Sequence, residues 1–337
     1  MELFKTLDCK GIVPDTPVYN SLISGFSLNS KWKEMQSLLN EMKSKNVHDV
    51  KTMNIVIDSY CKAGMVDEAQ KLVKDMECRG PRPSLVTYNT LIDGFITRGQ
   101  IEEARALFDS LNSKGFTPTV VTYNSIMSYY CKHKKMREAM SLFDKMSQEG
   151  VSPSLITYNI LLYGLFKIKK LRKAVVFFNG MTEIDISTWR ILLHGLCSLG
   201  LLDQAGWVLQ AFPFPDVQGY NILIQGAAKS GRRDLTSELL VGMRQRGLKP
   251  DNRTLNILLR SYFVAGDTEL AIQVFEDSEE LRGPDSYHIF LEGLINSAHH
   301  AHLVPQVLQL MEDKNIALKL PIPPTATKLL GLDGSEK

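Results

Sequence analysis

A recurring Tyr-Asn dipeptide at a fixed spacing constrains the fold of this chain more than any other feature of its sequence. The stretch LVTYNTLIDGF begins at Leu85, and similar stretches begin at Val120, Leu155 and Val217. Four successive asparagines lie 35 residues apart: Asn54, Asn89, Asn124 and Asn159. A fixed period of this length is typical of a row of identical supersecondary units, each of which packs mainly on its neighbours.

Each repeat is predicted to be a hairpin of two helices. Apolar residues in its first half follow the i, i+3, i+4, i+7 spacing of one helical face: Tyr88, Leu91, Ile92 and Phe95. Gly99 interrupts this helix, and a second apolar stripe follows it: Ala104, Leu107, Phe108 and Leu111. Gly115 and Pro118 end the second helix. One hairpin cannot bury both stripes by itself, so the sequence predicts an all-α solenoid of stacked hairpins.

The same pattern divides the chain into repeats, with a partial repeat before them and a tail after them. Residues 1–15 match only the end of a repeat, and residues 319–337 form the tail. The repeats lie near 16–49, 50–84, 85–119, 120–154, 155–185, 186–216, 217–251 and 252–283, with a degenerate repeat at 284–318. Because the chain starts inside a repeat, we expect a removed N-terminus or a truncated relative. No Arg- and Ser-rich targeting peptide is present in this chain.

The composition and the missing motifs predict neither an enzyme nor a membrane protein. No run of about 18 or more apolar residues occurs. Five scattered cysteines and a net charge of +2 fit reduced thiols in an intracellular compartment. The sequence holds no C-x-x-C, H-x-E, phosphate-binding glycine loop or nucleophile elbow. His299, His300 and His302 lack partners at ligand spacing, so we expect no metal, no cofactor and no catalytic residue.

Several recurring residues together resemble the pentatricopeptide repeat family. Along residues 1–318 the chain repeats an opening Tyr-Asn, a glycine after the first helix, an alanine in the second, a methionine near its end and a closing Gly-x-x-Pro. The resemblance is to the pure form of the family, whose repeats are uniform in length. It implies a right-handed superhelix of helix-turn-helix repeats that binds single-stranded RNA in plant organelles, one nucleotide per repeat.

A polar amide recurs one residue beyond the apolar stripe, although asparagine is a poor helix former. The asparagines are Asn20, Asn54, Asn89, Asn124, Asn159, Asn221 and Asn256. Arg190 takes the same slot in the sixth repeat. An amide at this slot can hydrogen-bond the Watson–Crick edge of an unstacked base. The structural alternative is an asparagine ladder that binds neighbouring backbone.

The residue that closes each repeat forms a second recurring set. Its members are Asp49, Ser84, Thr119, Ser154, Asp185, Asp216 and Asp251. By itself this set indicates only helix N-caps and Pro-Asp turns. The family resemblance implies that each closing residue selects a base together with the asparagine of its own repeat: Asp for uracil, Ser for cytosine and Thr for a loosely chosen pyrimidine. The implied RNA is U-C-pyrimidine-C-U-any-U-pyrimidine from its 5′ end, with no base assigned to Arg190.

Two further sets of residues complete the predicted site. The resemblance implies that Val86, Val121 and Ile156, three residues before an asparagine, wedge between successive bases. This slot differs in other repeats, which have Pro17, Lys51, Ser187, Gln218 and Arg253. Late in the first helix, Lys62, Lys132, Lys167 and Lys229 share a slot that suits a phosphate, although a solvated lysine is the simpler alternative. Residues 120–185 hold ten Lys or Arg against five acids, which fits a backbone-binding centre.

We therefore expect a sequence-selective, single-stranded RNA-binding protein that acts on organellar transcripts by occupying a site. Its other partners would be RNA-processing proteins, and its location would be the mitochondrion or, alternatively, the chloroplast. The competing hypothesis is a protein-binding scaffold of the tetratricopeptide type, which holds a peptide in the same groove. That class gives no reason for an asparagine at one groove position with Asp or Ser closing each repeat.

Overall fold

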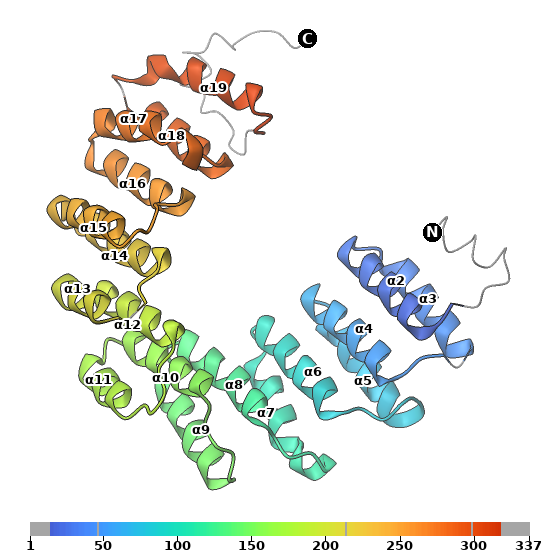
Figure 1. The fold of residues 1–337 in the computed structure, drawn as a ribbon. Coiled ribbons are helices and arrows are strands. Elements are labelled where there is room, and N and C mark those ends of the chain that lie inside the picture. Colours follow the sequence, from blue (N-terminus) through green and yellow to red (C-terminus); the bar gives the residue numbers. More distant parts are fainter. Residues whose placement is uncertain (1–13, 46, 213, 298, 318–337) are drawn as a thin grey trace, which may run out of the picture. The chain divides into compact units, whose positions relative to one another are not determined.

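The computed structural model describes residues 14–45, 47–212, 214–297 and 299–317. Across these ranges every regular element is a helix and no strand occurs, so the prediction of an all-α fold is confirmed (Figure 1). The contacts divide the chain into two compact parts, Met1–Asn179 and Gly180–Lys337.

The N-terminal part consists of five helical hairpins in chain order. They are α2 (Thr16–Leu28) with α3 (Trp32–Ser44), α4 (Val50–Lys62) with α5 (Val66–Arg79), α6 (Leu85–Thr97) with α7 (Ile101–Ser110), α8 (Val120–Lys132) with α9 (Met136–Gln148), and α10 (Leu155–Lys167) with α11 (Leu171–Asn179). A short 3-10 turn, η1 (Asn112–Lys114), follows α7. The first helices α2, α4, α6, α8 and α10 pack on one another in that order.

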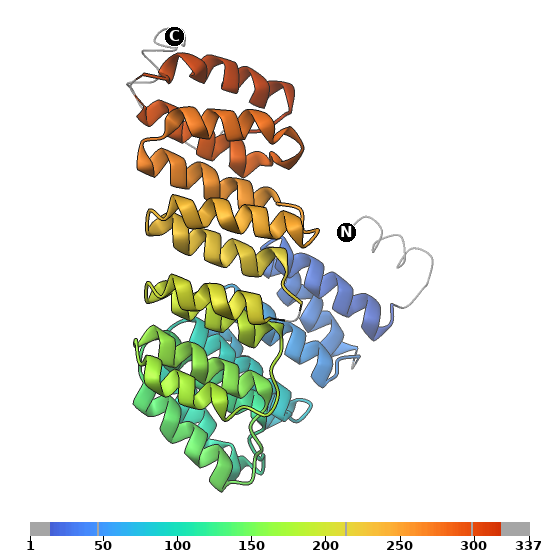
Figure 2. The ribbon, with the colours of Figure 1, turned by 60° about the vertical axis from the view of Figure 1, so that its left-hand side comes forward.

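The C-terminal part continues with four hairpins of the same kind. They are α12 (Ile186–Ser198) with α13 (Leu202–Ala211), α14 (Val217–Lys229) with α15 (Arg233–Gln245), α16 (Asn252–Ala265) with α17 (Thr268–Asp277), and α18 (Pro284–Asn296) with α19 (Val304–Asp313). The turns η2 (Glu279–Leu281) and η3 (Ala301–Leu303) lie near the end. Successive hairpins lie side by side within this part (Figures 1 and 2).

The first helices begin at capping residues that the sequence supplies. Asp49 caps α4, where its Oδ1 accepts the backbone N–H of Thr52 at 2.7 Å. This bond lowers the pKa of Asp49 below its ordinary value. Ser84 and Ser154 form capping boxes with the threonine three residues further on. Each cap satisfies N–H groups that a helix leaves open at its start, so the repeat boundary is also a helix boundary.

Small residues set the distance between neighbouring helices. The alanine of the second helix is fully buried in six repeats: Ala69, Ala104, Ala139, Ala174, Ala205 and Ala271. On the first helices, a glycine packs against the residue at the cysteine slot of the preceding repeat. A methyl group built on Gly94 would lie 2.3 Å from the Sγ atom of Cys61. Burial raises the pKa of Cys61 to about 12, which fits a packing role for this thiol.

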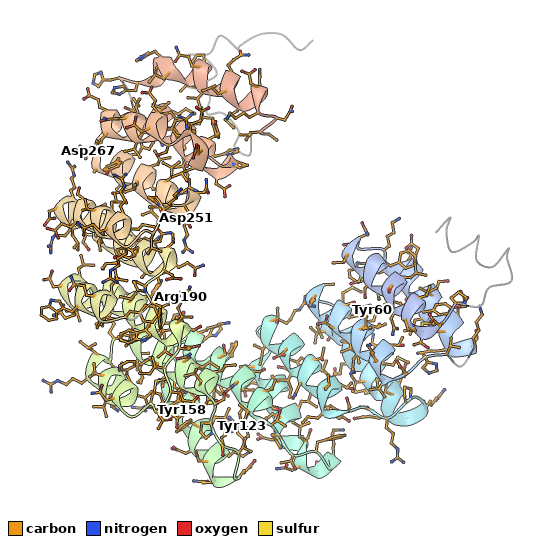
Figure 3. The ribbon with its side chains drawn as sticks, in the orientation of Figure 1. Tyr60, Tyr123, Tyr158, Arg190, Asp251 and Asp267 are labelled. Atoms are coloured by element: carbon orange, nitrogen blue, oxygen red, sulfur yellow. The ribbon has the colours of Figure 1, made fainter. Side chains whose placement is uncertain are left out.

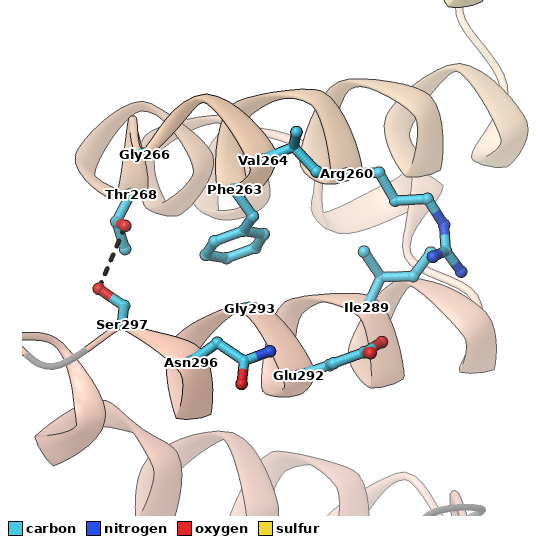
Figure 4. A pocket seen from close by; sticks show the side chains of 10 residues that line it. All are labelled: Arg260, Phe263, Val264, Gly266, Thr268, Ile289, Glu292, Gly293, Asn296 and Ser297. Atoms are coloured by element: carbon cyan, nitrogen blue, oxygen red, sulfur yellow. Dashed lines mark hydrogen bonds between the residues drawn. The ribbon is translucent and has the colours of Figure 1, made fainter. Parts of the chain in front are cut away.

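The same contact recurs near the end of the chain with a larger partner. Phe263 of α16 lies over Gly293 of α18, and a methyl group on Gly293 would lie 2.3 Å from the ring (Figure 4). Beside this contact, α16 and α18 enclose a shallow pocket of about 450 Å³, lined in part by Arg260 and Glu292. The Thr268 and Ser297 hydroxyls are 3.2 Å apart at its edge (Figure 4).

Candidate functional site

Five of the recurring asparagines bond to the next repeat through a side-chain hydroxyl. In each case the asparagine Oδ1 accepts a bond from the third residue of the following first helix. The distances are 2.7 Å for Thr87–Asn54, 2.9 Å for Thr122–Asn89, 2.8 Å for Thr157–Asn124, 2.7 Å for Thr254–Asn221 and 2.7 Å for Ser286–Asn256. These bonds go to side chains rather than to the neighbouring backbone that the structural alternative required.

The hydroxyl fixes which way the amide faces. Thr87 Oγ1 accepts the backbone N–H of Ser84 at 3.0 Å, so its own proton is donated to Asn54. An amide oxygen that accepts this proton turns the Nδ2 group of Asn54 away from the cap. Within the described ranges, the Nδ2 groups of Asn54, Asn89 and Asn124 form no bond, and these side chains are half-buried. Each of these three repeats therefore presents an oriented donor.

The same hydroxyl brings the closing residue of a repeat close to the asparagine of that repeat. Ser84 Oγ lies 3.2 Å from Thr87 Oγ1, which in turn bonds Asn54. Thr119 with Asn89, and Ser154 with Asn124, are joined in the same way through Thr122 and Thr157. The sequence placed these residues in pairs on resemblance alone, and the pairs are neighbours in space. We call this asparagine, hydroxyl and closing residue a reading cluster.

Four of the predicted clusters are less open, including that of the buried Asn159. Asn221 is only 1% exposed, because its Nδ2 donates to Asp251 Oδ1 at 3.0 Å while Thr254 holds its Oδ1. The Oδ1 of Asn20 is buried without a partner among the described residues. Asn256 donates to Asn252 Oδ1 at 3.1 Å. The sequence pattern alone does not distinguish these closed sites from the open ones.

The remaining predicted base-selecting residues lie at the same slots. Asn159 is buried at 9% exposure, and Asp185 caps α12 by accepting the backbone N–H of Thr188 at 2.8 Å. Asp216 caps α14 in the same way and also accepts a bond from Arg190 of α12. Figure 3 labels Arg190, whose long side chain replaces the asparagine of the other repeats.

The predicted stacking residues are exposed apolar side chains at one slot of three successive repeats. Val86 is 61% exposed, Val121 60% and Ile156 64%. Single exposed apolar residues are common on protein surfaces, but three at the same helical position form a regular row. Each lies at the second residue of its first helix, three residues before the asparagine, so the row follows the open reading clusters.

The predicted phosphate-binding lysines differ in how they are held. Lys62 forms an ion pair with Asp58 at 2.6 Å, so its charge is partly compensated. Lys167 lies over the ring of Tyr163, 5.5 Å from its centre. Lys132 and Lys229 are exposed. The lysines of the fourth and fifth repeats are therefore better placed than Lys62 to bind an anion.

Two features of the site were missed from the sequence. A threonine precedes three of the Tyr-Asn pairs, and its hydroxyl orients the amide of the repeat before it. The recurrence of VTYN and ITYN was a signal that could have shown this role. Lys134 and Lys169 occupy the turn between helices at φ values of 61° and 60°, where five other repeats have glycine and the first has Ser30. A side chain in this left-handed conformation costs about 1–2 kcal/mol, so both lysines destabilise their turns relative to glycine.

Neither a metal-binding cluster nor a membrane-spanning helix is found in the described ranges. No group of histidine, cysteine or acidic side chains there could hold a metal ion, and His299 and His302 are exposed. No helix in the described part of the chain is both long and apolar enough to cross a membrane.

Comparison with protein-family models finds one repeat along most of the chain. A model described as the PPR repeat family matches residues 48–97, 83–125, 118–167 and 215–264. A model described as the PPR repeat matches residues 17–47, 156–186, 187–211 and 253–282. The matches cover well over half of the chain and agree with the resemblance to a pure array of pentatricopeptide repeats.

Individual relatives match shorter stretches. A chloroplastic pentatricopeptide repeat-containing protein of Arabidopsis thaliana is 35% identical over 89 residues, 26% of this chain and 18% of that protein. A mitochondrial one is 35% identical over 79 residues, 23% of this chain and 12% of that protein. The crystal structure of the pentatricopeptide repeat protein PPR10 from maize has a TM-score of 0.56 at 25% identity, over 98% of this chain and 48% of that chain. The chain thus spans about half of that structure and less than a fifth of these two relatives.

Proposed function

Because the chain belongs to the pentatricopeptide repeat family, we propose that it is a sequence-selective, single-stranded RNA-binding protein. The observation that carries the proposal is the row of open reading clusters at Asn54, Asn89 and Asn124. Each presents an amide donor that a hydroxyl of the next repeat holds in one orientation. A peptide-binding scaffold has no need to orient an isolated amide once in every repeat.

Base selection follows from the donors and acceptors of each cluster. The asparagine Nδ2 group donates to a pyrimidine carbonyl, which cytosine and uracil share. The closing residue then distinguishes the two bases at N3. An Asp carboxylate accepts the N3–H of uracil, whereas a Ser hydroxyl donates to the unprotonated N3 of cytosine. The proposed target is U-C-pyrimidine-C-U-N-U-pyrimidine, in which Ser84 and Ser154 select the second and fourth bases at open clusters. Reading of the seventh base requires the bond between Asn221 and Asp251 to open.

The exposed apolar row and the basic segment support binding of an extended single strand. Val86, Val121 and Ile156 provide apolar surface against the faces of bases held at neighbouring clusters. Lys132 and Lys167 lie at the end of the same first helices, where a phosphate of the strand can be neutralised. Duplex RNA offers neither unstacked faces nor free Watson–Crick edges, so it should bind weakly.

The test is to change one closing residue. Ser154→Asp keeps a good N-cap, because Asp251 caps α16 at the equivalent position. We expect the variant to change its preference at the fourth base from C to U by roughly 5- to 150-fold, with the other positions unchanged. Competition binding with four RNAs that differ only at that base measures this, and Ser154→Thr serves as the matched control.

Two outcomes would reject the proposal. Equal affinity for pyrimidine, purine and duplex RNA would leave only a general basic surface. An unchanged fourth-base preference in a folded Ser154→Asp variant would show that the closing residue does not read RNA.

The biological setting is inferred from the relatives. Matched proteins carry chloroplastic and mitochondrial names, so we infer an organellar RNA target, with the mitochondrion as the first candidate and the chloroplast as the alternative. The chain would act by covering RNA and not by catalysis, and RNA-processing proteins are the expected partners at the covered site.

A further inference from the structure

The sixth repeat departs from the others at two slots that belong to one reading cluster. From α4 to α18, the third residue of each first helix is a threonine or serine except in α14, where it is Gly219. The asparagine slot that this residue would serve holds Arg190, the only slot among the first eight repeats without asparagine. The two exceptions therefore coincide, and the cluster loses its amide and its orienting hydroxyl together.

A different bond replaces the missing hydroxyl. The Nη2 group of Arg190 donates to Asp216 Oδ2, and Asp216 Oδ1 accepts the backbone N–H of Gly219 at 2.9 Å. The closing residue Asp216 thus holds the guanidinium directly, as Thr254 holds Asn221 in the next repeat. The side chains remain 31% and 30% exposed, so the pair is accessible from solvent. Arg190 Nε is buried without a partner among the described atoms.

Both carboxylate oxygens of Asp216 already accept hydrogen bonds, so Arg190 is the side chain of this cluster that is left to contact a base. Arginine has five N–H groups and no acceptor, and one of these groups is bonded to Asp216. Those that remain on the terminal nitrogens can form two parallel bonds in one plane. A base that matches them must present two neighbouring acceptors.

We propose that Arg190, held by Asp216, selects guanine as the sixth base; this inference rests on the proposed RNA-binding function. Guanine presents O6 and N7 side by side on an edge that has no amino group, the usual match for a bidentate arginine. Adenine places an amino donor beside N7, and cytosine places one beside N3. Uracil separates its two carbonyls by an N3–H donor. The target then becomes U-C-pyrimidine-C-U-G-U-pyrimidine.

The first experiment uses the full chain and four RNAs of sequence UCCCUNUC that differ at the sixth base. We expect the G-containing RNA to compete roughly 5- to 150-fold better than the other three. Replacing that guanine by 7-deazaguanine removes the N7 acceptor and should abolish most of the preference. A preference for A, C or U, or one that survives the 7-deaza substitution, overturns the proposal.

Two variants distinguish the selection of guanine by Arg190 from the attraction of its positive charge to RNA. Arg190→Lys keeps the positive charge but cannot donate two parallel bonds, so it should keep most of the affinity and lose the guanine preference. The double variant Arg190→Asn with Gly219→Thr restores the cluster of the other repeats, and with Asp216 it should prefer U. Circular dichroism and thermal melting check that both variants are folded. Retained guanine preference in Arg190→Lys would contradict the proposed contact.

The design also separates this inference from the proposed function. If the four RNAs bind equally while Ser154→Asp still changes the fourth-base preference, the assignment of Arg190 is wrong and the proposed function stands. If no single-stranded RNA binds, both fail.

Discussion

A single hydroxyl in each repeat connects helix capping to the proposed reading of RNA. Thr122 accepts the backbone N–H of its cap residue Thr119 at 3.1 Å and donates to Asn89 at 2.9 Å. Thr122 is 1% exposed, so its hydroxyl has no access to water in place of these partners. A buried polar group that loses its partner is costly, and this couples the fold of one repeat to the amide of the repeat before it.

Thr122→Val is the test of this coupling at the scale of one residue. The valine keeps the shape but leaves the Thr119 N–H and the Asn89 oxygen without this partner, so we expect a loss of about 1–3 kcal/mol in the free energy of unfolding. Selectivity at the third base should also fall, because the amide is free to turn. Urea denaturation and competition binding measure the two effects. Thr97→Val, at an exposed position of α6, is the control and should change stability by less than about 0.5 kcal/mol.

The sequence predicted the members of the reading clusters better than their accessibility. Asn54 and Ser84 each occupy a fixed slot of a regular repeat, and the resemblance to the pentatricopeptide repeat family paired the two slots. The burial of Asn221 could not be foreseen, since it depends on a bond from its amide to Asp251. Such bonds form between side chains about 30 residues apart and follow from packing in three dimensions.

At the scale of helices, the local signals were strong enough to predict the elements. Capping residues such as Asp49 and Ser84 lie directly before the first helices, and glycines lie in the turns that follow them. Pro305 lies within the second helix of the last repeat, although proline disrupts a helix interior. It lies in the first turn of α19, where its missing N–H has no partner to lose.

The contact between neighbouring first helices gives a prediction for Gly94. The methyl group of Gly94→Ala would meet the Cys61 sulfur at 2.3 Å, so we expect a loss of about 1–3 kcal/mol from overpacking. Gly25 occupies the equivalent slot in α2, where a methyl group meets no described heavy atom within 4 Å. Gly25→Ala should therefore stabilise the protein by about 0.5–1 kcal/mol. Thermal or urea unfolding of both variants measures the difference.

A double variant identifies the cause of that loss. Adding Cys61→Ala to Gly94→Ala removes the nearest atom and should recover part of the stability, because the two side chains share one contact. Equal losses for Gly94→Ala and Gly25→Ala would instead show that glycine is not required for close packing of α4 and α6.

At the scale of the whole molecule, charge is distributed unevenly along an otherwise near-neutral chain. The net charge is +2, yet residues 120–185 contain ten basic and five acidic residues. Lys134 and Lys169 are part of this excess although their left-handed turns favour glycine. This positive segment lies along the fourth and fifth repeats, where it would attract an anionic ligand.

This distribution predicts how RNA binding depends on salt. Each phosphate that a lysine neutralises on a single strand contributes about −0.7 to the slope of log affinity against log salt concentration. Changing Lys132 and Lys167 to glutamine should make the slope less negative by about 0.7 for each residue, while the preference for individual bases stays the same. Lys71→Gln, on the second helix α5, removes the same charge and should leave the slope unchanged. Titrations between low and moderate salt compare the variants directly, and a loss of base preference without a change in slope would place the two lysines at the bases instead of the phosphates.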